Sequence, residues 1–276
     1  MKKITVLYHN DLDGKCCAAI IDYYYKNEID TNLTFISFDY EKDYKVPKEV
    51  YKCDMLYIVD CTLDPNTMTD LFENYHKNNF IWIDHHISSI MNNNSSIYGT
   101  RLPGPNSACY LTWIDLYGYT DIPDAVKYIS DRDVWSYKWG KLTIGFTEWL
   151  ASQDNSVENK KMWYSIFENR NIGKHIDDGM IMYNSRIKML KDDVDRLSYE
   201  SEINGVKCLK MNCTSLYSIS DVCALMIEKG YEVAWSWYKA KEMKYHSLRS
   251  NGNIDVSEIA KKFGGGGHKN AAGFIT

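Results

Sequence analysis

Short apolar runs alternate with segments of helical periodicity through the first half of this 276-residue chain. The continuous apolar runs predict strands that are buried on both faces, and they occupy residues 4–8, 33–38, 55–59 and 80–83. Other segments carry apolar side chains at helical spacing, and they occupy residues 14–25, 65–77 and 106–117. This alternation predicts a mostly parallel sheet with helices on both of its faces.

The pattern of the second half is different. Residues from about 139 to 200 are polar and helical in spacing, and one long amphipathic helix is expected over 179–197. An Asn204-Gly205 pair then predicts a hairpin turn, and further expected elements are helices at 220–229 and 256–263 and strands at 231–238 and 243–250. We therefore expect an α/β protein with an N-terminal domain (1–150), a helical connector (151–200) and a smaller α/β C-terminal domain with a mixed sheet (201–276).

Composition places the chain among folded globular proteins, with 45% hydrophobic and 25% charged residues. No apolar stretch approaches the roughly 18 residues that span a bilayer, and the eight cysteines form no CxxC pair. We expect reduced thiols and a cytoplasmic protein. The net charge of −5 argues against a broad basic surface for long nucleic acid, but it is compatible with a short anionic substrate.

Acidic and imidazole side chains follow three of the predicted strands directly. These residues are His9, Asp11 and Asp13 after the first strand, Asp60 after the third, and Asp84, His85 and His86 after the fourth. Because the carboxyl ends of parallel strands share one edge of the sheet, we expect the three clusters to lie together. A further acidic pair, Asp131 and Asp133, follows in the sequence SDRDVW.

This mixture of carboxylates and imidazoles is typical of sites that hold two divalent cations about 3.5–4 Å apart, and it suits Mn²⁺ better than Mg²⁺ alone. A polar turn in which an Asp caps the next helix is an alternative for the first cluster. The second alternative, a plain surface turn, is less favoured for residues 84–86, because three titratable groups after the apolar FIWI are costly to desolvate without partners.

Five segments in order carry a resemblance that spans nearly the whole chain, and they read HNDLDG, YIVDC, DHH, SDRDVW and GGGGHKNAAGF. With these segments the chain resembles the DHH phosphoesterases that have a DHH-associated C-terminal domain. That subfamily includes RecJ-type exonucleases, nanoRNases, pAp phosphatases and cyclic-dinucleotide phosphodiesterases. The resemblance implies a two-metal phosphoesterase with a catalytic domain and a substrate-binding domain.

The resemblance also implies roles for individual residues. One metal would be bound by His9, Asp11 and Asp60, and the second by Asp13, Asp60, His85 and Asp131. Asp133 remains open as the alternative to Asp131. Asp84 would support the site, and His86 would stabilise transition-state charge or handle the leaving-group proton.

The C-terminal segment supplies candidate substrate-binding residues, namely Arg249, Gly264, Gly265, Gly266, Gly267 and His268. Glycines allow backbone N–H groups to approach a phosphate closely, and Arg249 can bind a phosphate in bidentate fashion. A flexible turn and a solvated arginine are the alternatives. The aromatic set of Trp235, Trp237 and Tyr238 is expected to pack a core or sheet face.

The predicted function is hydrolysis of short RNA or DNA oligonucleotides to mononucleotides by metal-activated water, with Mn²⁺ as cofactor and Mg²⁺ or Co²⁺ as alternatives. Rival hypotheses are a pAp phosphatase, a phosphodiesterase for cyclic or linear dinucleotides, and a catalytically inactive nucleotide-binding protein. Expected partners are these oligonucleotides or small nucleotide phosphates and no membrane. The sequence leaves a homodimer open.

Overall fold

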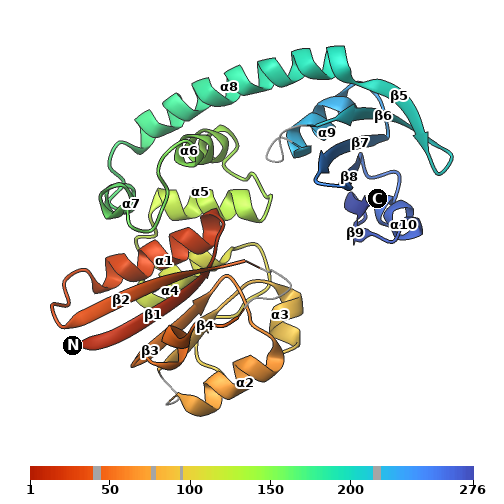
Figure 1. Ribbon diagram of the computed structural model, residues 1–276. Coiled ribbons are helices and arrows are strands. Elements are labelled where there is room, and N and C mark those ends of the chain that lie inside the picture. Colours follow the sequence, from red (N-terminus) through yellow and green to blue (C-terminus); the bar gives the residue numbers. More distant parts are fainter. Residues whose placement is uncertain (40–44, 76–78, 94–95, 214–218) are drawn as a thin grey trace. The chain divides into compact units, whose positions relative to one another are not determined.

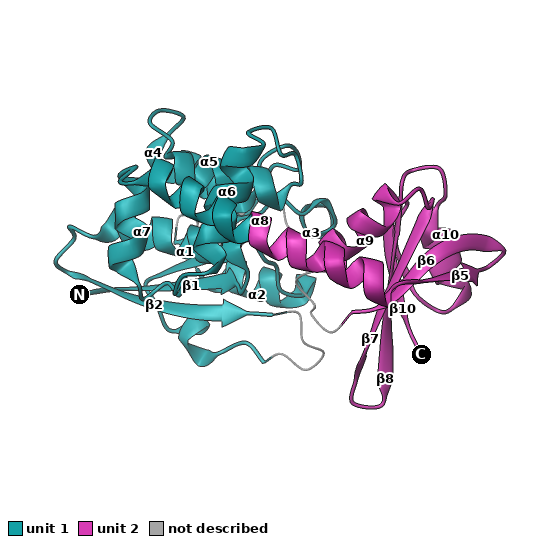
Figure 2. Cartoon of the chain, turned by 90° about the horizontal axis from the view of Figure 1, so that it is seen from above, with its two compact units in different colours: residues 1–183 teal, residues 184–276 magenta. Residues whose placement is uncertain are grey.

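The computed structural model describes residues 1–39, 45–75, 79–93, 96–213 and 219–276. The chain forms two compact units, Met1–Tyr183 and Asn184–Thr276 (Figure 2). Their boundary falls within the long helix α8 (Ile172–Leu197), which extends the helix expected over 179–197. The finer division into residues 1–150, 151–200 and 201–276 stays a prediction.

Unit 1 is built on a four-stranded parallel sheet in the order β2-β1-β3-β4. Its strands are β1 (Lys2–His9), β2 (Thr31–Phe38), β3 (Met55–Val59) and β4 (Phe80–Ile83). All four were expected from their apolar runs, and β3 and β4 are buried almost throughout, as is β1 from Ile4 to Tyr8. The expected burial on both faces is wrong for β2, an edge strand whose side chains are mostly half-buried. The α/β class with a parallel N-terminal sheet is confirmed.

Helices cover both faces of this sheet, and Figure 1 shows α1 on one side and α2 on the other. The helices of unit 1 are η1 (Lys48–Tyr51), α1 (Leu12–Tyr25), α2 (Pro65–Asn74), α3 (Ile87–Met91), α4 (Ala108–Tyr117), α5 (Asp124–Asp133), α6 (Lys141–Ala151) and α7 (Lys160–Phe167). Alternate strand residues feed two separate cores: Val6 packs in the core with α1 and α4, whereas Leu7 packs in the core with α2. The predicted helix at 65–77 ends at Asn74, and residues 76–78 lie outside the described ranges.

Unit 2 contains a six-stranded sheet in the order β5-β6-β7-β8-β10-β9. Its elements are β5 (Tyr199–Ile203), β6 (Val206–Asn212), α9 (Ile219–Glu228), β7 (Val233–Ala240), β8 (Met243–Ser250), α10 (Val256–Lys262), β9 (Gly266–His268) and β10 (Ala271–Ile275). Only the β6–β7 pair among these neighbours is parallel, so the sheet is mixed as predicted. Asn204 and Gly205 both have positive φ, 52° and 80°, which confirms the predicted hairpin turn.

Two further expectations concern the whole chain. All eight cysteines lie in the described ranges, none of them forms a disulfide, and every one except Cys53 is buried, in agreement with reduced core residues. None of the described helices combines the length and the apolar character that crossing a bilayer requires.

Candidate metal centre

Strand register aligns three of the predicted site residues. Tyr8 pairs with Val59 and Val59 pairs with Ile83, so the second-to-last residue of β1 and the last residues of β3 and β4 lie in one row. The residues near this row are His9, Asp60 and Asp84. The predicted gathering of polar groups at one edge of the sheet is therefore present.

Asp60 lies at the centre of the cluster with a buried carboxylate that is 1% exposed. Neither of its oxygens has a hydrogen-bond partner among the described residues. The nearest imidazole nitrogens are His85 Nε2 at 3.5 Å, His9 Nδ1 at 3.6 Å and His86 Nδ1 at 3.9 Å. These separations are slightly longer than the roughly 3.0–3.4 Å between two ligands that share a cation through bonds of about 2.1 Å. Burial, followed by the charge of Asp13, raises the pKa of Asp60 well above its ordinary value.

The backbone at Asp60 is also unusual, with φ of 57° in the left-handed region. This conformation costs a non-glycine residue roughly 1 kcal/mol or more and is found preferentially at functional sites. It turns the chain directly after β3, where the carboxylate enters the cluster. Buried oxygens without partners and a strained backbone together indicate a residue positioned for a ligand.

Three groups of side chains lie close enough together to hold a cation. They are His9, Asp11 and Asp60; Asp60, His85 and His86; and Asp13, His85 and Asp133, with the ligand atoms of each group within 4.8 Å of one another. Asp60 and His85 each belong to two groups, so the groups form one continuous cluster. Mixed carboxylate and imidazole ligands of this kind fit divalent transition metals.

The HNDLDG segment both caps α1 and contributes side chains to the cluster. Asp11 Oδ1 accepts a hydrogen bond from the Gly14 N–H at 2.9 Å and caps α1, while its Oδ2 lies 2.9 Å from His9 Nδ1. The bond to Asp11, with a second contribution from Asp60, raises the pKa of His9 to about 10. Burial opposes ionisation of Asp11, but His9 and the Gly14 N–H outweigh it and lower the pKa of Asp11 to about 2. A Cβ at Gly14 would overlap the His9 backbone, so glycine is required there.

Asp13 is anchored by the N-terminus of α4. Its carboxylate accepts hydrogen bonds from Ser107 Oγ at 2.6 Å and from the N–H groups of Ala108 and Cys109, both at 2.9 Å. Asp13 Oδ2 lies 3.9 Å from His85 Nε2. Ser107 was not among the predicted site residues, and it falls inside the helix that was expected over 106–117. In the structure it directly precedes α4, and its hydroxyl bonds Asp13 and makes no cap bond to α4.

Asp84 organises the residues that follow it. Its Oδ1 accepts hydrogen bonds from the N–H of His85 at 2.8 Å, from the N–H of His86 at 3.0 Å, and from His86 Nδ1 at 2.8 Å. The bond to Asp84 outweighs burial and raises the pKa of His86. Because Nδ1 is engaged, Nε2 is the ring nitrogen of His86 that can meet a substrate, and the side chain is 45% exposed.

The structure brings Asp133, and not Asp131, into the cluster. The Asp133 carboxylate lies 3.4 Å from His85 Nε2, and burial followed by the charge of Asp13 raises the pKa of Asp133 to about 7. The Asp131 carboxylate instead accepts hydrogen bonds from the Lys138 N–H at 2.8 Å, the Trp139 N–H at 3.2 Å and the Thr143 hydroxyl. Both acids lie on α5, and residues two positions apart on a helix point in different directions.

The predicted substrate-binding residues lie in unit 2. Ala271 of β10 pairs with His268 on one side and with Arg249 on the other, so these three residues share a face of the sheet. Arg249 donates to Leu248 O at 3.0 Å and to Ser220 Oγ at 3.4 Å. A Cβ at Gly267, where φ is 140°, would overlap Ala271 and Ala272. The glycine run therefore allows β9 to approach β10.

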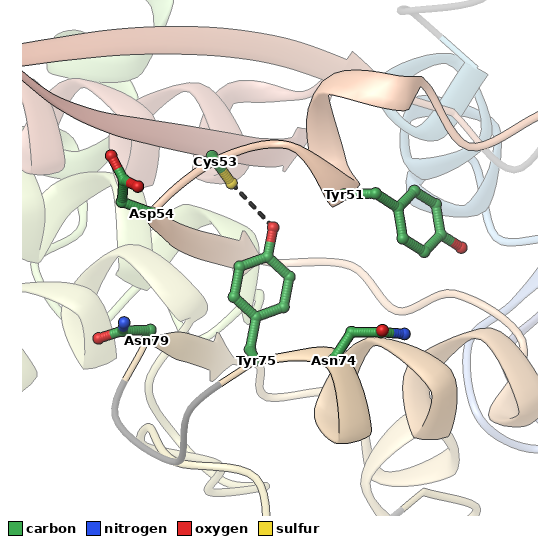
Figure 3. A pocket seen from close by; sticks show the side chains of 6 residues that line it. All are labelled: Tyr51, Cys53, Asp54, Asn74, Tyr75 and Asn79. Atoms are coloured by element: carbon green, nitrogen blue, oxygen red, sulfur yellow. Dashed lines mark hydrogen bonds between the residues drawn. The ribbon is translucent and has the colours of Figure 1, made fainter.

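A separate pocket of about 360 Å³ in unit 1 contains none of the predicted site residues. It is lined by Tyr51, Cys53, Asp54, Asn74, Tyr75 and Asn79, and Cys53 Sγ lies 3.0 Å from Tyr75 Oη (Figure 3). Cys53 and Asp54 precede β3, and Asn79 precedes β4. This pocket is therefore at the opposite end of the strands from Asp60 and Asp84.

Comparison with known proteins adds family information to this geometry. Residues 219–276 match the DHHA1 domain. Protein R106 of Acanthamoeba polyphaga mimivirus is 28% identical over 295 residues, an alignment that covers 98% of this chain and 66% of the viral protein. The chain thus spans just under two thirds of that relative.

Solved structures share the fold over the whole chain. The pGpG-specific phosphodiesterase PggH of Vibrio cholerae has a TM-score of 0.55 at 15% identity, covering 100% of this chain and 93% of PggH. An exopolyphosphatase-related protein of Bacteroides fragilis has a TM-score of 0.54 at 16% identity, and the alignment covers 99% of this chain and 86% of that protein. The exonuclease RecJ bound to manganese has a TM-score of 0.52 at 14% identity, and the alignment covers 99% of this chain and 85% of RecJ.

Fold and site together define an α/β protein in which aspartate and histidine side chains that could bind metal ions cluster at the carboxyl edge of a parallel sheet. The resemblance to the DHH family, with its DHHA1 domain at the C-terminus, is confirmed.

Proposed function

We propose that this protein is a phosphodiesterase that hydrolyses short oligonucleotides to mononucleotides with the help of two divalent cations. The observation that carries the proposal is the Asp60 carboxylate, which is buried, has no hydrogen-bond partner among the described residues and faces three imidazoles. A buried carboxylate in this state is costly unless a cation compensates it. Cations bound there would lower the pKa of water and offset charge on the phosphoryl oxygens.

Two sets of ligands share Asp60. We assign His9 and Asp11 with Asp60 to one cation, and Asp13, His85 and Asp133 with Asp60 to the other. Asp133 replaces Asp131 in this assignment because the Asp131 carboxylate is fully engaged with backbone N–H groups and Thr143. Mn²⁺ is the favoured ion because the ligands mix imidazole and carboxylate, and RecJ of similar fold binds manganese.

His86 acts on the substrate in this proposal. Asp84 accepts from Nδ1 at 2.8 Å and holds the ring in place, which leaves Nε2 to stabilise phosphoryl charge or to donate a proton to the leaving oxygen. Asp84 is fully buried, so its role is to position His86.

The substrate is proposed to be short because the net charge of −5 offers no broad attraction for long nucleic acid. Hydrolysis of linear or cyclic dinucleotides is a second candidate, favoured by the shared fold of a pGpG-specific phosphodiesterase. A pAp phosphatase and an inactive nucleotide-binding protein are the remaining hypotheses. The cytoplasmic location likewise stays a prediction.

The test is product analysis over time with the full chain and Mn²⁺ on labelled RNA and DNA of about two to five nucleotides, with pGpG and pAp in parallel. The proposal expects mononucleotides from the oligonucleotides and no product with the Asp60→Asn variant. Turnover of pGpG or pAp alone would support the corresponding rival. Tight nucleotide binding without any product would leave only the inactive binding protein.

A further inference from the structure

One face of the unit 2 sheet carries three successive rows of residues with different chemistry. Cross-strand partners point to the same face, and alternate residues along a strand share it. The first row contains His268, Ala271 and Arg249, and the second contains Gly266, Gly273, Ser247 and Ser236. The third row contains Ile275, Tyr245 and Tyr238. Basic, small and aromatic side chains thus follow one another about 6.8 Å apart.

A pocket of about 510 Å³ covers the second and third rows. We call it the aromatic pocket, and the residues of these rows that line it are Tyr238, Tyr245, Ser247, Gly266, Gly273 and Ile275. Its volume lies within the range typical of sites for small molecules. A Cβ at Gly273 would lie 2.7 Å from the His246 carbonyl oxygen, so a residue without a side chain suits the close approach of β10 to β8 at this pocket.

The rings of Tyr238 and Tyr245 lie parallel to each other in this pocket. Their rings stack with centroids 4.9 Å apart and planes inclined by only 6°, and Figure 2 shows the long β7–β8 hairpin that carries them. Both side chains are partly exposed. A planar ring placed parallel to them would extend the stack, and such stacking tolerates every base because each base has a π-face.

The charges around this pocket indicate where a phosphate would lie. The described residues that line the aromatic pocket include one histidine, His246, whose ring nitrogens bond Trp235 and Thr276, and no carboxylate, lysine or arginine, which favours a neutral planar occupant. Arg249 and His268 lie in the adjoining row and can donate hydrogen bonds to an anion. A neutral ring next to a phosphate is the chemistry of a nucleotide.

We propose that the aromatic pocket binds the base of the terminal nucleotide of the substrate, which extends the stack of Tyr245 and Tyr238, while Arg249 and His268 hold its phosphate. This rests on the proposed function for the identity of the substrate, but the pocket makes its own prediction about ligands. The sequence analysis assigned Tyr238 to packing. The structure gives it a partly exposed ring in a pocket, whereas Trp235 packs against the core as expected.

Binding is measured by calorimetry on the metal-free full chain in EDTA, so that the metal cluster cannot hold the phosphate. AMP is compared with ribose 5-phosphate, which has the same phosphate and sugar but no base. We expect AMP to bind at least about tenfold more tightly, because stacking of one base has an effect of this size or larger. Equal affinities, or no binding of AMP up to millimolar concentration, would overturn the proposal.

Substitutions test whether the ring of Tyr245 causes the preference for AMP over ribose 5-phosphate. Tyr245→Leu should remove most of the preference for AMP, and Tyr245→Phe should keep it because the ring remains. Tyr199→Leu is the matched control, since Tyr199 is a 49% exposed tyrosine on the edge strand β5 of the same unit, and its preference should equal that of the wild type. A well-folded Tyr245→Leu protein, verified by circular dichroism, with an unchanged preference would contradict the pocket.

The two proposals can fail separately. If the wild type with Mn²⁺ cleaves no phosphodiester, including bis(4-nitrophenyl) phosphate, the proposed function is wrong. The preference for AMP in EDTA is then judged by the binding experiment independently. Conversely, efficient cleavage together with equal binding of AMP and ribose 5-phosphate would reject the base pocket only.

Discussion

The strand-end cluster of unit 1 and the three-row face of unit 2 use opposite physical strategies. The first concentrates buried carboxylates that repel one another, and the pKa values of Asp60 and Asp133 are raised. The second combines glycine, serine and stacked tyrosine rings with Arg249 and His268 in the adjoining row. A site of the first kind is destabilising until a cation arrives. A site of the second kind is preformed and recognises shape.

The largest expected effect is that of Asp60→Asn. Loss of the shared ligand should reduce Mn²⁺-dependent hydrolysis by at least about 10³-fold. The same change should raise the melting temperature of the protein in EDTA, because it removes a buried carboxylate whose ionisation burial and Asp13 oppose. Asparagine tolerates the left-handed backbone at this position.

A buried aspartate with partners provides the matched control. Asp22 is 3% exposed and accepts from Lys160 Nζ and Tyr164 Oη, both at 2.7 Å. Asp22→Asn should therefore lower the melting temperature in EDTA and leave Mn²⁺ binding intact. A lower melting temperature for both variants would contradict the claim that the Asp60 carboxylate destabilises the metal-free protein.

The next effect separates Asp133 from Asp131. Asp133→Asn should reduce hydrolysis by about 100-fold with little loss of stability, as expected for removal of one ligand. Asp131→Asn should cost about 2–3 kcal/mol of folding free energy, because three hydrogen bonds to a carboxylate are weakened. Denaturant titration and kinetics on both variants provide the measurement, and the reverse pattern would restore Asp131 as the ligand.

Acid unfolding offers a second readout for Asp131. Burial alone would raise the pKa of Asp131, but the bonds from Thr143, Lys138 and Trp139 outweigh burial and lower it below its ordinary 3.8. The stabilisation should therefore be fully present above about pH 4 and should be lost as the pH falls through the lowered folded-state pKa. The Asp131→Asn variant should lack this loss.

A smaller effect is expected from Ser107→Ala. This substitution removes the 2.6 Å hydrogen bond that orients Asp13 but leaves the bonds from Ala108 and Cys109. Hydrolysis should fall by about tenfold through weaker Mn²⁺ binding. Saturating Mn²⁺ should restore most of the rate, and failure to do so would assign Ser107 a role beyond the orientation of Asp13.

The smallest effect is a thermal shift on addition of metal. Mn²⁺ at about 100 times its dissociation constant should stabilise the wild type by about 2.7 kcal/mol, which is roughly 5–11 °C for a chain of this size. EDTA should reverse the shift, and Asp60→Asn should show little of it. An equal shift in the wild type and this variant would place the bound metal elsewhere.

Much of the fold and most of the cluster could be predicted from the sequence. Apolar runs identified β1, β3 and β4, and the polar groups that follow them meet at one edge because parallel strands end there. The motifs in order indicated the family. These features depend on local patterns and on connectivity, which a sequence contains directly.

Tertiary structure alone decided between Asp131 and Asp133, linked Ser107 to Asp13, and placed Tyr238 beside Tyr245 in a pocket. Each of these depends on which face of an element meets a distant segment. Helical spacing shows that Asp131 and Asp133 point in different directions, but only packing shows which direction leads to His85. The sequence determined the chemical groups and their strands, and long-range packing determined their orientation and therefore their partners.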